Sequence, residues 1–173
     1  MKKKVLRDIV LALCLLSLAG IAFIVIRDMM RTPEDYMALA REQIKEKNYH
    51  TGVVSLLRAA KGGLAEADYE LALLYNAGDK IPENRPKAIE HMKSAADKDF
   101  APAQYVLGVW TEQGYFGEAD TAAAVRLYEQ AAKQGHKNAM TSLVVLYAGI
   151  DGVPANKERQ NYWMRKLSQG AKK

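Results

Sequence analysis

The chain has 173 residues, of which 49% are hydrophobic and 26% are charged, which is ordinary usage for one modest globular domain. Its formal charge of +5 arises near the N-terminus: residues 1–31 hold six basic and two acidic side chains, which leaves 19 basic and 18 acidic side chains in the rest. A nearly neutral body excludes nucleic-acid binding driven by neutralisation of phosphates.

Residues 9–26 form an uninterrupted run of 18 residues without a charge. As a helix this run would extend about 27 Å, close to the thickness of the hydrocarbon core of a bilayer, so it predicts one transmembrane anchor. Three lysines and Arg7 precede the run, whereas Arg27 and Arg31 after it are offset by nearby acids. The positive-inside rule therefore predicts that residues 1–8 lie in the cytoplasm and that the rest of the chain faces a bacterial periplasm.

Two other interpretations of this segment stay open. The small residues from Ser17 to Gly20 could form the cleavage site of a signal peptide, but the apolar run continues through residues 21–26, which favours an uncleaved anchor. Cys14, the only cysteine, could mark a lipoprotein, although Leu13 stands where that motif has a small residue. With Cys14 in the bilayer, the rest of the chain contains no thiol and no disulfide.

Residues 27–64 are predicted to hold a linker and a degenerate first pair of helices. Thr32 as N-cap, Pro33 at the first helical position and acids in the first turn predict the start of the first helix. A second helix is expected at about residues 50–61, and the two glycines that follow it predict its end.

The remaining chain repeats itself with a period of 36 residues, in copies predicted at about 67–102, 103–138 and 139–173. The recurring positions are Ala67, Ala103 and Ala139; Leu71, Leu107 and Leu143; and Asn84, Asp120 and Asn156. Alanine pairs at Ala59-Ala60, Ala95-Ala96 and Ala131-Ala132 keep the same spacing and allow neighbouring helices to approach closely. Such a period predicts an all-α stack of helix-turn-helix units, in which each unit needs its neighbours to bury its apolar face.

These copies resemble the Sel1-like repeat, a relative of the tetratricopeptide repeat. In the first copy the resemblance is carried by Ala67, Tyr69, Leu71, Ala72, Tyr75, Gly78, Asn84, Lys87, Ala88, Ala95 and Ala96. The later copies match through Tyr105, Gly108, Gly114, Ala124, Gly135, Tyr147, Gly152 and Trp163. The departures are His91 in the first copy and Thr111, Leu127 and Thr141 in the later ones. The resemblance implies a right-handed α-solenoid whose first helices line a concave groove.

Few residues could carry catalysis. The three histidines, His50, His91 and His136, lack the spacing of metal ligands, and no phosphate-binding or nucleophile motif occurs. Asp97 and Asp99 are two residues apart, so on a helix they do not face each other. We expect a protein that is not an enzyme and that has no cofactor, no catalytic residue and no metal site.

The first helix of each repeat has a second face, opposite the predicted core positions, with residues at the spacing i, i+4, i+7. The residues predicted to line a partner-binding groove are Tyr69, Leu73, Asn76, Tyr105, Val109, Glu112, Gln113 and Val145. Their aromatic and aliphatic composition suits a peptide or a partner helix. In the alternative interpretation, Leu73, Val109 and Val145 pack against adjacent first helices. Tyr115 and Phe116 offer a possible loop contact, or they tuck under their own turn.

We therefore expect a membrane-anchored scaffold in the periplasm that binds another protein as an adaptor in an envelope assembly. The alternative is an immunity protein that neutralises a secreted lipase or another envelope-targeting toxin, which the resemblance implies for small tethered members. A glycan-binding enzyme would need paired carboxylates among the aromatic residues, where only Glu112 lies. The partners expected are a protein and, through residues 9–26, the membrane, with no nucleic acid. The repeat domain is expected to be a monomer, and a homo-oligomer joined through the ends of the stack is a further possibility.

Overall fold

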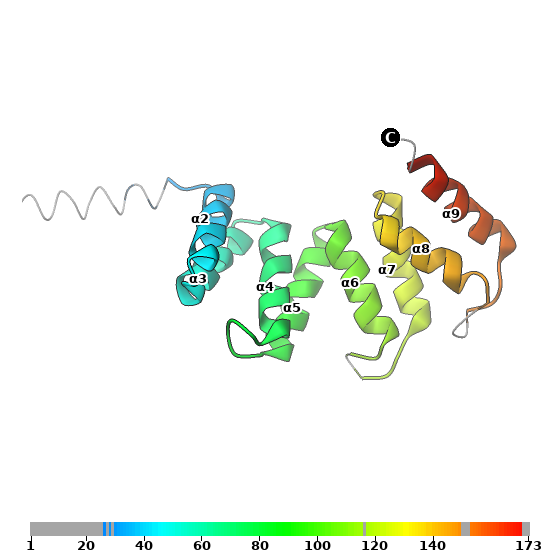
Figure 1. Cartoon of the computed structure of the whole chain (residues 1–173), viewed down its shortest axis with the longest axis horizontal. Coiled ribbons are helices and arrows are strands. Elements are labelled where there is room, and N and C mark those ends of the chain that lie inside the picture. The colour runs from blue at the N-terminus through cyan, green and yellow to red at the C-terminus, as the bar shows by residue number, and fades with distance from the viewer. Residues whose placement is uncertain (1–25, 27, 29, 116, 150–152, 171–173) are drawn as a thin grey trace, which may run out of the picture.

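The computed structural model describes residues 26, 28, 30–115, 117–149 and 153–170, and this part of the chain contains eight helices and no strand. The helices are α2 (Pro33–Lys45), α3 (Tyr49–Lys61), α4 (Ala65–Ala77), α5 (Arg85–Asp97), α6 (Ala101–Glu112), α7 (Thr121–Lys133), α8 (Lys137–Leu146) and α9 (Lys157–Gly170). They follow one another in a row from the N-terminal to the C-terminal end (Figure 1). The predicted all-α architecture is confirmed.

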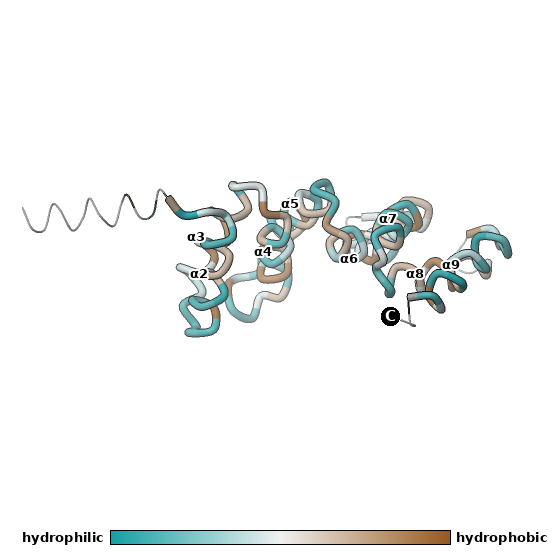
Figure 2. The backbone as a smooth tube through the Cα atoms, turned by 90° about the horizontal axis from the view of Figure 1, so that it is seen from above, coloured by the Kyte–Doolittle hydropathy of each residue, from teal (hydrophilic) through white to brown (hydrophobic). Residues whose placement is uncertain are grey.

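The helices form four pairs that stack in chain order. Within a pair, α2 packs on α3, α4 on α5, α6 on α7 and α8 on α9; between pairs, the second helix of one contacts the first helix of the next. Figure 2 shows α2, α4 and α6 along one side of the row and α3, α5 and α7 along the other. Because each pair meets only its neighbours, the molecule is an α-solenoid.

Capping groups explain where the helices begin. The Thr32 hydroxyl accepts a hydrogen bond from the Asp35 backbone N–H at 3.2 Å, and Asp35 accepts one in return from the Thr32 backbone N–H at 2.9 Å. The recurring polar position of the repeats has the same role at the second helices. There the side chains of Asn84, Asp120 and Asn156 accept hydrogen bonds from the backbone three residues on.

The hydrophobic core lies at the joints between successive pairs. Leu56, Met92 and Tyr128 occupy the same repeat position and are fully buried, each against the first helix of the following pair. The alanines Ala59, Ala95 and Ala131, which recur three residues after them, are fully buried as well. Burial of one large apolar side chain contributes about 1.5–3 kcal/mol, so the stack is stabilised mainly joint by joint.

The predicted anchor, residues 9–26, lies outside the described residues except for Ile26, and it stays a prediction. Within the described part of the chain, no helix has both the length and the apolar character needed to cross a bilayer. Other boundaries differ slightly from expectation. The second helix begins at Tyr49 rather than at about residue 50. Leu74 and Tyr75 are half-buried at the α3–α4 joint.

Candidate protein-binding site

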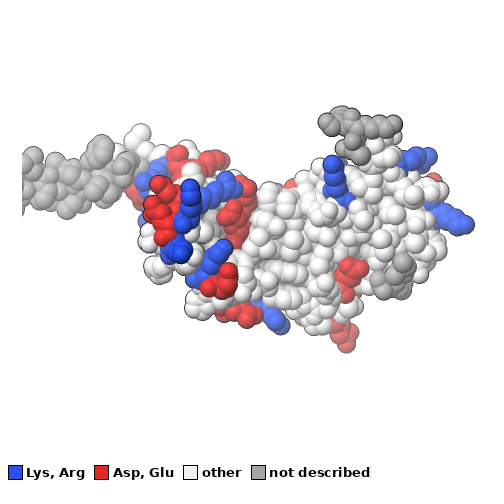
Figure 3. Space-filling view, in the orientation of Figure 1, with Lys and Arg blue, Asp and Glu red and all other residues white. Residues whose placement is uncertain are grey.

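Two of the first helices of the repeats carry few charges, whereas α4 carries Glu66, Asp68 and Glu70. Helix α6 contains one charged residue, Glu112, and α8 contains one, Lys137. Figure 3 shows a broad uncharged surface over the middle of the molecule, while charged side chains gather at the α2 end. We call the eight predicted groove residues on these helices the first-helix face.

The two tyrosines of the first-helix face are half-buried and pack in equivalent ways. The ring of Tyr69 meets the ring of Phe100 edge-on at 5.4 Å between centroids, and the ring of Tyr105 stacks on His136 at 4.7 Å. Phe100 and His136 are both N-cap residues of the next first helix. Burial, and to a lesser degree the charge of Glu70, raises the pKa of Tyr69. Each tyrosine therefore helps to fix the angle between successive pairs.

Two polar members of the face, Asn76 and Glu112, already have partners inside the protein. Asn76 accepts a hydrogen bond from the hydroxyl of Tyr115, and Glu112 accepts one from the hydroxyl of Tyr128 at 2.5 Å. Burial together with the bond to Glu112 raises the pKa of Tyr128 well above its ordinary range. The bond of Asn76 fastens the second pair to the third, and the bond of Glu112 holds α6 to α7 within the third pair.

The loop residue Tyr115 lies within the joint between the second and third pairs. Its ring stacks on Trp110 at 4.7 Å, and the guanidinium of Arg85 lies 4.6 Å from its centroid. The hydroxyl of Tyr115 reaches Asn76 on α4. Phe116 lies outside the described residues, so the predicted loop contact is placed for Tyr115 alone.

Three residues of the face are exposed to solvent. Leu73 is 38% exposed, Val145 is 46% exposed and Gln113 at the end of α6 is exposed. Val109 is half-buried against the cluster between the third and fourth pairs, as the alternative interpretation expected for it.

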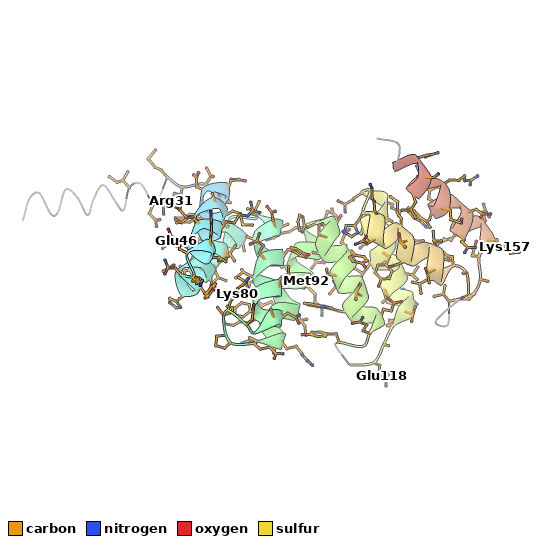
Figure 4. The ribbon with its side chains drawn as sticks, viewed as in Figure 1. Arg31, Glu46, Lys80, Met92, Glu118 and Lys157 are labelled. Atoms are coloured by element: carbon orange, nitrogen blue, oxygen red, sulfur yellow. The ribbon has the colours of Figure 1, made fainter. Side chains whose placement is uncertain are left out.

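A shallow cleft of about 350 Å³ between α2 and α4 brings two predicted residues together. Tyr69 and Leu73 line it beside Ile44, which sequence reasoning left in the first helix without a role. Figure 4 shows Lys80, another lining residue, between the α2–α3 pair and α4. Whether Ile44 lies beside α4 depends on the tilt of the first helix pair. In the sequence, the signal that points to Ile44 is its helical spacing from Ala40.

Behind this face, a buried carboxylate joins α4 to α5. Asp68 accepts hydrogen bonds from Ser94 at 3.0 Å and from the ammonium group of Lys98 at 2.6 Å, and lies 2.8 Å from Nδ1 of His91. Burial would raise the pKa of Asp68, but the hydrogen bonds from His91, Lys98 and Ser94 outweigh it, so the pKa lies below its ordinary value. Asp68 is therefore held as a carboxylate.

The next repeat replaces this charged cluster with amides. Gln104, 36 residues after Asp68, is buried and accepts a hydrogen bond from Gln134 at 2.9 Å, where Gln134 stands 36 residues after Lys98. Sequence reasoning missed both buried polar residues. The signal that could have found them is the 36-residue period itself, since both follow the recurring alanine directly.

The cluster around Asp68 does not form a hydrolytic site. Ser94 donates its proton to Asp68, whereas a nucleophilic serine would donate to an imidazole. Across the described residues, His, Cys, Asp and Glu side chains form no group of three or more that could hold a metal ion. The geometry fits a structural role for these groups.

Comparison with known proteins finds a family model that matches the two central helix pairs. The Sel1 repeat model matches residues 65–100 and 101–136, which correspond to α4–α5 and α6–α7 and cover the first two expected repeats. Two crystal structures share the fold. One is a protective antigen present in uropathogenic Escherichia coli strains displaying an SLR fold, with a TM-score of 0.71 and 22% identity, covering 82% of this chain and 32% of that one. The other is a Sel1 repeat protein from Oxalobacter formigenes, with a TM-score of 0.71 and 24% identity, covering 80% of this chain and 57% of that one.

Curated relatives are longer proteins. The chitin synthase regulator SKT5 of Malassezia restricta is 30% identical over 126 residues, which are 68% of this chain and 9% of that protein. The DAP3-binding cell death enhancer 1 of Mus musculus is 33% identical over 95 residues, which are 54% of this chain and 18% of that protein. Chitin synthase regulatory factor 4 of Schizosaccharomyces pombe is 35% identical over 89 residues, which are 51% of this chain and 13% of that protein. The chain thus spans less than a fifth of the length of these relatives. Residues 65–136 of this protein match the Sel1 repeat model in two copies and lie within a longer stack of helical pairs.

Proposed function

We propose that this protein is a scaffold that binds another protein through its first-helix face, as an adaptor in an assembly of the bacterial envelope. The observation that carries the proposal is the exposure of apolar side chains on the first helices, Leu73 on α4 and Val145 on α8, together with a broad uncharged surface over the middle of the molecule (Figure 3). An apolar surface of this kind on a solenoid is suited to hold a peptide or a helix.

The names of the curated relatives support a binding role. Two of them regulate chitin synthase and one binds DAP3, and each contains a segment similar to this chain. Regulation and binding both require a surface that recognises another protein.

The composition of the face indicates the chemistry of the partner. Of the eight residues of the face, Glu112 alone is charged, and it is bonded to Tyr128, so the face itself offers little electrostatic attraction. A matching segment would present aliphatic side chains to Leu73 and Val145 and an uncharged polar group to Gln113. We expect the affinity of such a complex to change little between low and physiological salt.

The membrane tether in this proposal rests on the sequence of residues 1–31. We propose that residues 9–26 hold the repeats at the inner membrane, with the repeats in the periplasm. Full-length protein should then stay with bacterial membranes after carbonate extraction, and protease added to spheroplasts should digest the repeats. Recovery in the soluble fraction, or protection from the protease, would refute the tether without affecting the binding face.

Affinity capture from gently solubilised membranes tests the binding face. Leu73→Asp with Val145→Asp adds two charges at exposed positions of the face and should reduce the captured partner about tenfold. The matched control, Ala122→Asp with Gln130→Asp, adds the same charge at exposed positions of α7 and should capture as the native chain does. Both variants should keep their helical circular dichroism. Equal capture by the two variants would overturn the proposal, and a secreted toxin as the partner would replace the adaptor role with immunity.

A further inference from the structure

Helix α3 has an apolar outer surface that the other central second helices lack. Val54 is 40% exposed and Leu57 is 41% exposed, although both face away from the core. The equivalent positions of α5 and α7, 36 and 72 residues later, carry charged side chains: Glu90 and Lys93, and Arg126 and Glu129. In α9 the pair is Tyr162 and Arg165. Val54 and Leu57 are therefore exposed aliphatic residues at positions where α5 and α7 have charged side chains.

These residues line a cleft of about 600 Å³ between α3 and the loop that joins α4 to α5. Its apolar lining consists of Val53, Val54, Leu57, Tyr75, Ile81 and Pro82. In Figure 1 this loop bows toward the α2–α3 pair, below α3. This cleft shares Lys80 with the cleft between α2 and α4, but Val54 and Leu57 of its wall come from α3, and Leu73, Gln113 and Val145 do not line it.

The next joint of the solenoid shows why this cleft is open. There the ring of Tyr115 occupies the space between the loop and the neighbouring pair, stacked on Trp110 and covered by Arg85. The residue 36 positions before Tyr115 is Asp79, which is exposed. Since Asp79 supplies no ring, the apolar wall formed by Val54 and Leu57 is left uncovered.

Cations exceed acids around the cleft. Lys80 and Lys87 line it together with one acidic residue, Glu83. The ammonium group of Lys87 lies 5.2 Å from the centroid of Tyr75, at the apolar lining. Among the residues that the structure describes, neither lysine forms an ion pair, so both charges can meet a carboxylate from outside.

We infer that this cleft is a second docking surface, which takes an acidic segment of another protein. The segment places an aliphatic or aromatic side chain against Val54 and Leu57, as Tyr115 fills the next joint, and sets carboxylates beside Lys80 and Lys87. Apolar contact gives the affinity, and the two lysines select for acidic sequence. This inference is independent of the first-helix face and of the function proposed for it.

A library of 12-residue peptides displayed on phage, panned against the full chain, tests the inference. The selected peptides should carry at least two Asp or Glu residues next to Leu, Phe or Trp. A synthetic peptide of the selected sequence should bind the native chain in a fluorescence anisotropy titration. Leu57→Asp should weaken this binding about tenfold, and so should Lys80→Glu with Lys87→Glu. Affinity should also fall as salt is raised.

Two controls locate the binding. Lys133→Glu with Lys137→Glu makes the same change of charge at exposed positions of the third and fourth pairs and should leave the affinity unchanged. Leu73→Asp on the first-helix face should also leave it unchanged. If Leu57→Asp perturbs folding, Val54→Thr with Leu57→Thr replaces it, and it should still weaken binding. Selection of peptides without acidic enrichment, selection of none, or loss of binding through Leu73→Asp alone would overturn the inference.

Discussion

Gly108 on α6 lies directly against the buried ring of Tyr128 on α7. A Cβ placed on Gly108 would lie 2.7 Å from Cε1 and 2.8 Å from Cδ1 of that ring. The ring is fully buried and its hydroxyl is bonded to Glu112, so it has little freedom to move aside. Close packing of the third pair therefore depends on the absence of a side chain at residue 108.

Gly108→Ala should destabilise the protein, although alanine is the better helix former. Overpacking of a core costs about 1–3 kcal/mol, against a gain of about 1 kcal/mol in helix propensity. We expect a net loss of about 1 kcal/mol in the free energy of unfolding, measured by urea denaturation. In the Tyr128→Leu background the same substitution should cost nothing or stabilise. A stabilising effect of Gly108→Ala in the native chain would contradict the contact.

Asp68 should make stability depend on acid pH. Because the folded state lowers its pKa, the carboxylate contributes stability that is fully present above its ordinary value of 3.8 and is lost as pH falls through the lowered folded pKa. Asp68→Asn should cost about 2 kcal/mol near neutral pH, since hydrogen bonds to a charged group are lost. The difference between the two proteins should shrink below pH 3.8, as followed by thermal unfolding.

The matched control for Asp68 is Asp97→Asn, which removes an exposed carboxylate from the same helix pair. This substitution should change the unfolding temperature little at any pH. If Asp68→Asn behaves in the same way, the network around Asp68 contributes nothing to stability.

His136 should make stability depend on pH in a higher range. Its Nδ1 accepts the N-terminal hydrogen bond of α8 from the Ala139 backbone N–H at 3.3 Å, which a protonated imidazole cannot do. Burial lowers the pKa of His136, so its contribution is fully present above the ordinary value of 6.5 and is lost as pH falls through the folded pKa. His136→Asn keeps a capping group that does not titrate. We expect the urea midpoint of the native chain to fall more than that of the variant between pH 7.5 and pH 5.0; parallel curves would rule out this role.

Tyr115 should contribute to stability through the joint between the second and third pairs. Tyr115→Phe removes the hydroxyl bonded to Asn76 and should cost about 1 kcal/mol. Tyr115→Ala also removes the ring between Trp110 and Arg85 and should cost about 2 kcal/mol or more. Hydrogen exchange should show the lost protection in α4 and α6. Unchanged exchange there, with loss of partner capture, would instead assign Tyr115 to a binding surface.

Much of the architecture could be predicted from local sequence because the signals are local. Thr32 and Asp35 lie three residues apart, and their two reciprocal hydrogen bonds cap the helix independently of the fold of the rest of the chain. The 36-residue period likewise pointed to the recurring positions Leu71, Leu107 and Leu143, all of which are buried in the stack.

The candidate sites were less accessible to sequence reasoning. The helical spacing placed Tyr69, Leu73 and Asn76 on one face, but it could not tell which of them are free. Tyr69 packs on Phe100, and Asn76 bonds to Tyr115, so both are engaged by the following pair, while Leu73 is exposed.

By itself, the sequence determined the helices, their caps and the repeat, because these depend on residues within one or two turns of each other. The tertiary structure decided which side chains remain available, because that depends on the angle at which one pair meets the next. The presence of Asp79 where the next repeat has Tyr115 shows the difference. In the sequence this is a change of one residue, and in the solenoid it leaves the apolar surface of Val54 and Leu57 uncovered.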